Sequence, residues 1–367
     1  MRINFIKKKY RLYSRQKKYK TKNKVKKTIT NYIKLFFICI LIIIYFNMHK
    51  SKKKPILNKI YPNVSLNETI ESINETSTTT TTIKKNIRNF EYFCCFCAMG
   101  KKENLYSREL ISYYSNLGVE KFIFGDNNDP NTEKLSDVLQ DYINNGTVDI
   151  IDIIGSSVGQ SEFYGILYEK YKKRCEWLTF FDFDEYLVMH FEEGKNIGLK
   201  EYLSNKIFDK CEAIAFNWLM YSDNGLAHYD KRPLNERSTL PRPKKDDRTY
   251  VKSIVRGNLD RQAFVDKKTN HRPVPEVKLC DSMGQFVSYY SDTYPTTYKY
   301  AYLKHFCFKS TEEYITKFLK GGCGGLKYNL ENLEGTIQFY FKNNNFTEEK
   351  LKVFEKYFNR TFNVYHI

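Results

Sequence analysis

Residues 177–186 read Trp-Leu-Thr-Phe-Phe-Asp-Phe-Asp-Glu-Tyr, an apolar segment that runs directly into acidic side chains. This pattern predicts a strand over residues 177–183 that ends at Asp182 and Asp184. Two carboxylates one residue apart at a strand end can bind a hard divalent cation, which keeps positions open for phosphate oxygens. The alternative interpretation is a pair of solvated turn carboxylates, because Asp-x-Asp is short enough to arise by chance.

Strands and helices alternate on both sides of this segment. Hydrophobic periodicity predicts strands at residues 90–97, 121–124, 147–154 and 213–218. Helical patterns separate them, the first ending at Gly118 and the next two covering residues 135–143 and 161–173. Short strands separated by helices are typical of a mainly parallel sheet that helices cover. We therefore expect an α/β fold with a mixed, mainly parallel sheet.

Polar residues follow three of the predicted strands. In open α/β sheets, ligands bind at the carboxyl ends of the strands. The first strand leads into Lys101-Lys102-Glu103, the second ends at Asp126, and the strand at 177–183 ends in the acidic pair. These residues are the first candidates for a functional site.

The positive charge of the chain is concentrated near its N-terminus. The chain has a net charge of +18, but residues 1–59 hold 19 Lys and Arg and no Asp or Glu. The other 308 residues hold 41 basic and 42 acidic residues, so this part is close to neutral. This balance does not indicate a basic nucleic-acid-binding face, and we predict no nucleic-acid partner.

An unbroken apolar run of 12 residues covers 35–46. It is shorter than the about 20 residues of a standard membrane span, so a buried core helix and a signal-peptide segment are alternatives. No small-residue cleavage site follows, and more basic residues precede the run than follow it. We expect a single-pass type II membrane protein with a basic cytoplasmic tail (1–34), a signal anchor (35–48) and a stem (49–89).

Two further features agree with a secretory compartment. Six asparagines begin Asn-x-Ser/Thr sequons: Asn63, Asn67, Asn74, Asn145, Asn345 and Asn359. Eight of the nine cysteines follow the apolar run, which permits disulfides in an oxidising lumen, although the pairing cannot be read from the sequence. The segment Cys94-Cys95-Phe96-Cys97 lacks the paired spacing of a zinc site, and we expect it to supply core residues and one disulfide partner.

Several motifs, in their order along the chain, resemble glycosyltransferase family 92 and related family-2-like bacterial enzymes. They are Glu103–Gly118, Lys121–Asn127, Gln160, Glu176-Trp177 with Asp182-x-Asp184-Glu185, and Lys304-His305-Phe306 with Lys309-Ser310-x-Glu312-Glu313-Tyr314-Ile315-x-Lys317. The resemblance covers about residues 90–325 and implies a GT-A fold, a UDP-sugar donor (UDP-galactose foremost), a glycan acceptor, Mn²⁺ and inversion at the sugar carbon. An anchor followed by a stem and a catalytic domain is also the arrangement of Golgi glycosyltransferases.

The resemblance also implies roles for single residues. Asp182 and Asp184 match the metal-binding pair, and His305 matches a position that supplies a further metal or diphosphate contact. Contacts to the donor are implied for five residues: Glu103, Asp126, Gln160, Asp182 and His271. The alternatives are a core histidine for His305 and a loop-structural role for His271. The family's Arg-Pro ending of the strand at 252–256 is Arg256-Gly257 here, which weakens that part of the match.

The catalytic base and the C-terminal region carry the weakest signals. Inverting transfer requires a carboxylate within hydrogen-bond reach of the acceptor hydroxyl. We predict Asp223, after the strand at 213–218, as this base; a turn aspartate before Gly225 is the alternative, and acidic residues of the C-terminal helices are other candidates. Ser310 and Glu313 predict a capping box at the start of a helix over 311–319. Residues 326–367 are predicted to form a helical extension of the domain at 90–325.

These observations predict an inverting, Mn²⁺-dependent glycosyltransferase that acts in the Golgi or another secretory membrane with its catalytic domain in the lumen. Two other classes stay open. A sugar-phosphate transferase shares the Asp-x-Asp motif and differs in leaving phosphate on the product. A membrane-anchored carbohydrate-binding protein would not need a metal at the strand end.

Overall fold

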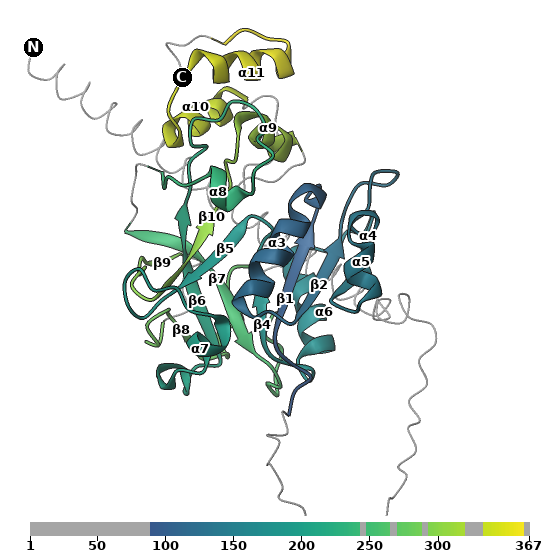
Figure 1. Cartoon of the computed structure of the whole chain (residues 1–367), viewed down its shortest axis with the longest axis vertical. Coiled ribbons are helices and arrows are strands. Elements are labelled where there is room, and N and C mark those ends of the chain that lie inside the picture. Colours follow the sequence, from purple (N-terminus) through teal and green to yellow (C-terminus); the bar gives the residue numbers. More distant parts are fainter. Residues whose placement is uncertain (1–88, 243–246, 265–269, 288–292, 320–332, 363–367) are drawn as a thin grey trace, which may run out of the picture. The chain divides into compact units, whose positions relative to one another are not determined.

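A computed structural model describes residues 89–242, 247–264, 270–287, 293–319 and 333–362 of the chain (Figure 1). The predicted tail and anchor, and the stem up to residue 88, lie outside the described residues. Within the described ranges, no helix is long and apolar enough to cross a membrane.

The described residues form a mixed sheet whose strands follow the order β3-β2-β1-β4-β7-β6-β10-β5. The strands of this path are β1 (Tyr92–Gly100), β2 (Lys121–Asp126), β3 (Val148–Asp152), β4 (Cys175–Phe180), β5 (Glu185–Met189), β6 (Ala213–Met220), β7 (Arg248–Arg256) and β10 (Ala301–His305). Two short strands extend it, with β8 (Leu279–Cys280) beside β6 and β9 (Thr293–Pro295) beside β7. The first four strands of the order are parallel, and β7 is antiparallel to both of its neighbours. The predicted α/β class with a mixed sheet and flanking helices is confirmed.

Alternating side chains of β1 face two different hydrophobic clusters. Cys94 and Phe96 pack in the cluster that includes α3 (Asn104–Leu117), whereas Cys95 packs in the cluster that includes α6 (Gln160–Tyr171). This alternation follows from the two-residue period of a strand, which sends successive side chains to opposite faces of the sheet. The central strand is therefore apolar on both faces, and helices cover each of them (Figure 1).

The other helices are short. They are α4 (Leu135–Val138), α5 (Gln140–Asn144), α7 (Leu199–Leu203), the 3-10 turn η1 (Lys206–Phe208), α8 (Leu234–Arg237), α9 (Thr311–Leu319), α10 (Leu333–Asn343) and α11 (Glu348–Phe358). The single helix predicted over 135–143 is wrong, because the backbone leaves helical geometry at Leu139. The side chain of Leu139 is fully buried in the core, so packing at this residue overrides the helical pattern.

The C-terminal helices α10 and α11 pack against α9 (Figure 1). Together they share one hydrophobic cluster that includes Phe308, Tyr314, Phe318, Ile337, Tyr340 and Phe354. The predicted domain boundary at residue 325 falls between α9 and α10. The described parts of the C-terminal extension therefore contribute to the same core as the motif around α9.

Two disulfides join strands of the sheet to neighbouring segments. Cys95 of β1 bonds Cys175 at the start of β4, and Cys211, before β6, bonds Cys280 of β8. The segment 94–97 supplies one disulfide partner, as predicted, and its other two thiols are buried. Cross-links of this kind are typical of proteins from oxidising compartments.

Candidate functional site

A cleft of about 490 Å³ opens at the carboxyl ends of β1 and β4, beside the first residue of α6. Its lining consists of Met99, Lys101, Glu103, Asn127, Val158, Gly159, Gln160, Asp182, Phe183, Asp184 and Lys317. Four of the residues predicted from sequence are therefore brought together: Glu103, Gln160, Asp182 and Asp184. The placement agrees with the expectation that ligands bind at the carboxyl ends of parallel strands.

Asp182 is the partly exposed member of the acidic pair. Its Oδ1 atom accepts a hydrogen bond of 2.6 Å from the Gln160 Nε2 atom, and its Oδ2 atom lies 2.9 Å from the Lys252 Nζ atom. Burial raises the pKa of Asp182, but the positive charge of Lys252, its hydrogen bond and other nearby groups together outweigh burial and leave the pKa below its ordinary value. The carboxylate is therefore ionised at neutral pH.

Lys252 lies on β7 and is completely buried. Its Nζ atom also lies 5.8 Å from the centre of the Tyr164 ring, which gives the ammonium group a second favourable contact. Burial lowers the pKa of Lys252, but the charge of Asp182, its hydrogen bond and the neighbouring carboxyl groups together more than compensate, so the pKa lies above its ordinary value. Sequence reasoning did not assign Lys252 a role, although a lone lysine inside the apolar strand Val251–Val255 is a usable signal for a buried ion pair.

Asp184 is almost fully buried and contacts two basic side chains. The Lys317 Nζ atom lies 2.5 Å from Oδ2, and the His305 Nε2 atom lies 3.6 Å from Oδ1. Burial raises the pKa of Asp184, yet the charge of Lys317, together with the other basic groups around it, leaves the pKa well below its ordinary value. Lys317 was not assigned a role from the sequence, because a lysine on an amphipathic helix usually marks a solvated face.

Glu185, the third acidic residue, does not line the cleft. Its side chain is fully buried, and Oε2 accepts a hydrogen bond of 3.0 Å from the backbone N–H of Asp182. Burial raises the pKa of Glu185 well above its ordinary value. The side chain thus holds the turn that presents the Asp-x-Asp pair.

His305 is placed beside Asp184 by strand pairing. In the antiparallel pairing of β10 with β5, His305 lies opposite Glu185, and its ring packs 4.1 Å from the ring of Trp218. Burial lowers the pKa of His305 to about 4, so the imidazole is neutral at pH 7. The buried Nδ1 atom has no hydrogen-bond partner among the described residues. The packing against Trp218 agrees with the core alternative, and the metal contact of His305 stays a prediction.

The residues around Asp184 fit a divalent cation in part. A neutral imidazole and a carboxylate are suitable ligands, and Asp184 Oδ1 and His305 Nε2 lie close enough to face one ion. Among the described residues, no group of three or more His, Cys, Asp or Glu side chains is arranged to hold a metal. Substrate oxygens and water would have to complete the coordination, as is usual for Mg²⁺-like ions in phosphate sites.

Glu103 lies at the edge of the cleft and is nearly buried. Its Oε2 atom is 3.4 Å from the Lys309 Nζ atom, and the same ammonium group lies 3.4 Å from the centre of the Tyr106 ring. Glu103 therefore connects the cleft to the buried polar residues at the start of α9.

Asp126 does not line the cleft, in contrast to the neighbouring Asn127. Its carboxylate accepts hydrogen bonds from the backbone N–H groups of Asn128 (3.0 Å) and Leu135 (2.7 Å). The side chain is buried and holds the turn between β2 and α4. The structure thus gives Asp126 a turn-holding role, and its donor contact stays a prediction.

His271 lies beside the cleft rather than in it. Its ring packs between those of Trp218 (5.2 Å) and Tyr250 (4.9 Å), and its Nδ1 atom lies 3.1 Å from the carbonyl oxygen of Val251. The preceding Asn270 contacts the side-chain oxygen of Gln160. His271 is therefore linked to the cleft through Asn270, and its donor contact stays a prediction.

The structure does not support Asp223 as the catalytic base. The side chain is 1% exposed, and its Oδ2 atom contacts the Lys350 Nζ atom (2.6 Å) and the Tyr340 hydroxyl (2.5 Å). Its Oδ1 atom accepts a hydrogen bond of 2.9 Å from the backbone N–H of Gly225. These partners belong to a turn and to α10 and α11, so the carboxylate holds the C-terminal helices and is closed to an acceptor hydroxyl.

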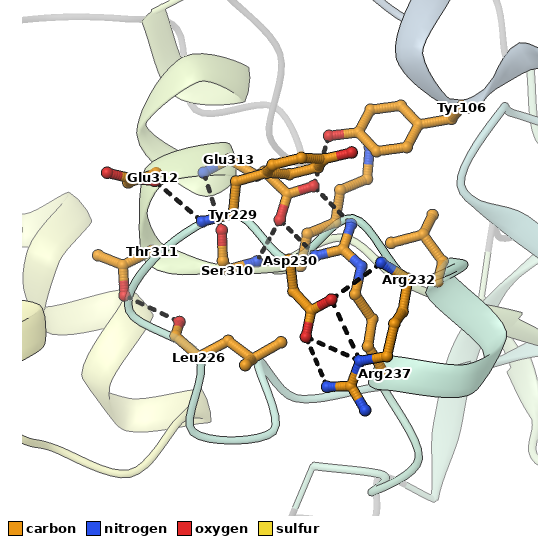
Figure 2. Close-up of polar contacts among 12 residues, drawn as sticks. Tyr106, Leu226, Tyr229, Asp230, Arg232, Arg237, Ser310, Thr311, Glu312 and Glu313 are labelled. Atoms are coloured by element: carbon orange, nitrogen blue, oxygen red, sulfur yellow. Dashed lines mark hydrogen bonds and ion pairs between the residues drawn. The ribbon is translucent and has the colours of Figure 1, made fainter.

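A buried ion pair fixes the start of α9 (Figure 2). Figure 2 shows Glu313 between Arg237 and Tyr106; its two oxygens accept hydrogen bonds of 2.6 and 2.7 Å from the guanidinium and of 2.6 Å from the Tyr106 hydroxyl. The predicted capping box is confirmed, since Glu313 accepts from the Ser310 N–H at 3.0 Å and donates from its own N–H to the Ser310 hydroxyl at 3.3 Å. Lys317 follows one helical turn later, so the anchor determines where its backbone lies.

Comparison with known protein families agrees with the sequence motifs. Residues 90–259 match the family model of glycosyltransferase family 92, which confirms the predicted resemblance over this segment. The match includes the strands from β1 to β7 and the residues of the Asp-x-Asp pair. His305 and Lys317 follow the matched segment. No curated protein matches the chain.

Proposed function

Because residues 90–259 match glycosyltransferase family 92, we propose that the chain transfers a sugar from a UDP-sugar, UDP-galactose foremost, to a hydroxyl of a glycan or glycoconjugate. One observation supports this most directly: the Asp-x-Asp pair lies in a cleft at the strand ends, and both carboxylates are ionised and paired with lysines. A pair of solvated turn carboxylates would have neither the burial nor these partners. We further propose that the domain has the GT-A fold that is expected of this family.

The charges in the cleft suit a diphosphate only when positive charge is added. The lysines that contact Asp182 and Asp184 are used in offsetting these two carboxylates, so they leave no excess positive charge for a diphosphate. A Mn²⁺ ion held by Asp184 and His305, with Asp182 beside it, would act as a Lewis acid on the leaving nucleotide. Lys101 and Lys317 line the same cleft and can contact phosphate oxygens.

Gln160 and Asp182 position the donor side of the cleft. The Gln160 Nε2 atom donates to Asp182 Oδ1 at 2.6 Å and to the Tyr164 hydroxyl at 2.8 Å, and that hydroxyl lies 3.3 Å from the same Asp182 oxygen. This arrangement holds one Asp182 oxygen in place, since a carboxylate bound on both sides has little freedom to rotate. Inversion at the sugar carbon stays part of the proposal without an assigned base, because Asp223 is enclosed.

We propose that the described region lies in the lumen of the Golgi or another secretory compartment, behind a type II anchor. Two disulfides support this, as do the exposed positions of the sequon residues Asn145, Asn345 and Asn359. Sealed microsomes test the topology: residues after the anchor should resist added protease and carry glycans. Complete digestion in intact vesicles would refute it.

The function is tested with the full chain, a panel of nucleotide sugars and Mn²⁺, by measuring release of free nucleotide. We expect one UDP-sugar to support release, and Asp184→Asn to abolish it because the substitution removes a charge with little change of shape. Asp209→Asn is the matched control, since Asp209 is exposed and outside the cleft. The proposal fails if no donor gives release, or if Asp184→Asn binds UDP with unchanged Mn²⁺ dependence. A product that retains phosphate would identify a sugar-phosphate transferase instead.

A further inference from the structure

The two lysines that neutralise the Asp-x-Asp pair differ in their freedom to move. Lys252 contacts Asp182 from inside the sheet and has no exposed side-chain surface. Lys317 contacts Asp184 from α9, its side chain is 15% exposed, and it lines the cleft. Only Lys317 can therefore exchange its carboxylate partner for a group that enters the cleft.

Buried polar contacts fix the backbone of α9 one helical turn before Lys317. Glu313, four residues earlier on α9, is bound by Arg237 and Tyr106 (Figure 2). Residues four apart lie on the same face of a helix, so this anchor and Lys317 point toward the same side. A lysine has a flexible stem of four carbons, so its ammonium group can move while the helix stays in place.

Lys317 and a divalent cation would compete for Asp184. The ammonium group lies 2.5 Å from Oδ2, so a cation bound to Asp184 would stand close to a like charge. His305 faces the other oxygen, Oδ1, with a neutral ring nitrogen at 3.6 Å. A cation that binds Asp184 Oδ1 and His305 would therefore put a second positive charge beside Lys317 and repel it, and a diphosphate in the cleft would offer the ammonium group another anionic partner.

We propose that Lys317 is an internal counter-ion that occupies Asp184 in the empty cleft and moves to the donor diphosphate when a divalent cation takes its place. The inference rests on the proposed function, which supplies the diphosphate. One consequence is that metal and nucleotide bind cooperatively: the metal releases Lys317 for the phosphates, and the phosphates stabilise Lys317 away from Asp184. By linkage, each ligand must raise the affinity for the other by the same factor.

The alternative is a fixed ion pair that only stabilises the fold. A fixed pair predicts that loss of Lys317 lowers the melting temperature and weakens the metal site, because Asp184 loses its neighbour and the turn relaxes. The counter-ion predicts the opposite for the metal alone, because its competitor has been removed. Binding measurements without any turnover distinguish the two.

The experiment compares the wild-type chain, Lys317→Met and Lys352→Met by titration calorimetry with Mn²⁺ alone, and with UDP at saturating Mn²⁺. Lys352 is exposed on α11, so its variant is the matched control for loss of a lysine charge. In Lys317→Met we expect Mn²⁺ alone to bind about fivefold more tightly and UDP about tenfold more weakly, with the mutual enhancement of affinity largely lost. Lys317→Arg should retain the enhancement, and Lys317→Gln replaces the methionine variant if that variant does not fold.

Two outcomes overturn different statements. Unchanged or weaker Mn²⁺ binding in Lys317→Met, in a chain whose wild type binds UDP with Mn²⁺, refutes the counter-ion and leaves the proposed function intact. A wild-type chain that binds UDP under no condition refutes the proposed function, and the counter-ion with it. Tighter Mn²⁺ binding with weaker UDP binding, absent from Lys352→Met, supports the proposal.

Discussion

Glu313 is the residue where three segments distant in sequence meet. Tyr106 of α3, Arg237 of α8 and the first turn of α9 all contact its carboxylate, and Arg237 is 2% exposed. A buried ion pair adds little net stability compared with apolar residues, but removal of one partner leaves an uncompensated buried charge. The site therefore depends on Glu313 although Glu313 lies outside the cleft.

We predict that Glu313→Gln lowers the free energy of unfolding by about 3 kcal/mol at pH 7, because the Arg237 charge stays buried without its counter-charge. Glu334→Gln is the matched control, since Glu334 forms an exposed pair with Arg360 at 2.7 Å and should change stability by less than about 1 kcal/mol. Urea unfolding followed by circular dichroism measures both. Equal effects of the two substitutions would contradict the assigned role of Glu313.

The difference in stability between the wild type and Glu313→Gln depends on pH, and the pKa of Glu313 sets the direction of this dependence. Burial raises the pKa of Glu313, but hydrogen bonds from Arg237 and Tyr106 bring it below its ordinary value. A carboxyl with a lowered pKa in the folded state stabilises the fold above its ordinary pKa, and this contribution is lost as the pH falls below it. The wild type and Glu313→Gln should therefore approach each other in stability below about pH 4.5.

The acidic pair could be predicted from the sequence, whereas its lysine partners could not. Asp182 and Asp184 follow an apolar segment, and a strand end is a position that local pattern alone identifies. Lys252 and Lys317 reach the pair from β7 and α9, about 70 and 130 residues further along the chain. Their approach depends on strand order and on the anchor of α9, which no local pattern contains.

At the scale of elements, β7 shows how a close backbone contact restricts sequence. Gly257, just after β7, donates its N–H to the Glu176 carbonyl at 2.7 Å. A β-carbon at this position would lie 1.9 Å from the Cys175 carbonyl oxygen and 2.6 Å from that of Lys172. Gly257, which stands where the resemblance expects proline, therefore lets the backbone after β7 pass close to the backbone at the end of α6.

We predict that Gly257→Ala destabilises the fold by about 2 kcal/mol, because backbone atoms must move apart to accept the methyl group. Gly159→Ala is the control, since a β-carbon there meets no atom within 4 Å and the glycine needs no positive φ. Thermal unfolding monitored by calorimetry compares the two variants. A smaller effect for Gly257→Ala than for the control would mean that the backbone around Gly257 can accept a methyl group without cost.

Element types were more predictable than element pairing. The strands at β1 to β4 and the helix at α9 follow from periodicity and capping residues, and α9 has the predicted bounds Thr311–Leu319. The order in which β7 separates β4 from β6 is set by contacts between distant residues, as in the pairing of Phe180 with Ser253. The two-residue strand β8 is held by its pairing with β6 and by the Cys211–Cys280 bond, so its own sequence carries little signal.

At the scale of the whole molecule, the C-terminal helices complete the fold. Asp223 is enclosed by Lys350 and Tyr340, and the hydrophobic cluster of α9 continues into α10 and α11. A chain that ends at the predicted boundary of residue 325 would lack these partners. It would leave a buried carboxylate uncompensated and aromatic side chains exposed to water.

We predict that a chain ending at residue 325 fails to fold stably and elutes as an aggregate in size-exclusion chromatography. A chain ending at residue 362, after the described C-terminal residues, is the control and should elute as a compact species. Proteolysis gives a second measurement, since the shorter chain should be cut rapidly within α9. A monodisperse, protease-resistant product ending at 325 would show that the C-terminal helices are a separate addition.

The antiparallel position of β7 in the sheet order also has a consequence during synthesis on the ribosome. The parallel strands β1 to β4 are complete when residue 180 has emerged, but β7, which covers the open edge of β4, ends 76 residues later at residue 256. At translation rates of about 5–20 residues per second, that edge stays uncovered for about 4–15 s. An uncovered strand edge is a template for pairing with another nascent chain, so we expect chaperones to be most needed in this interval.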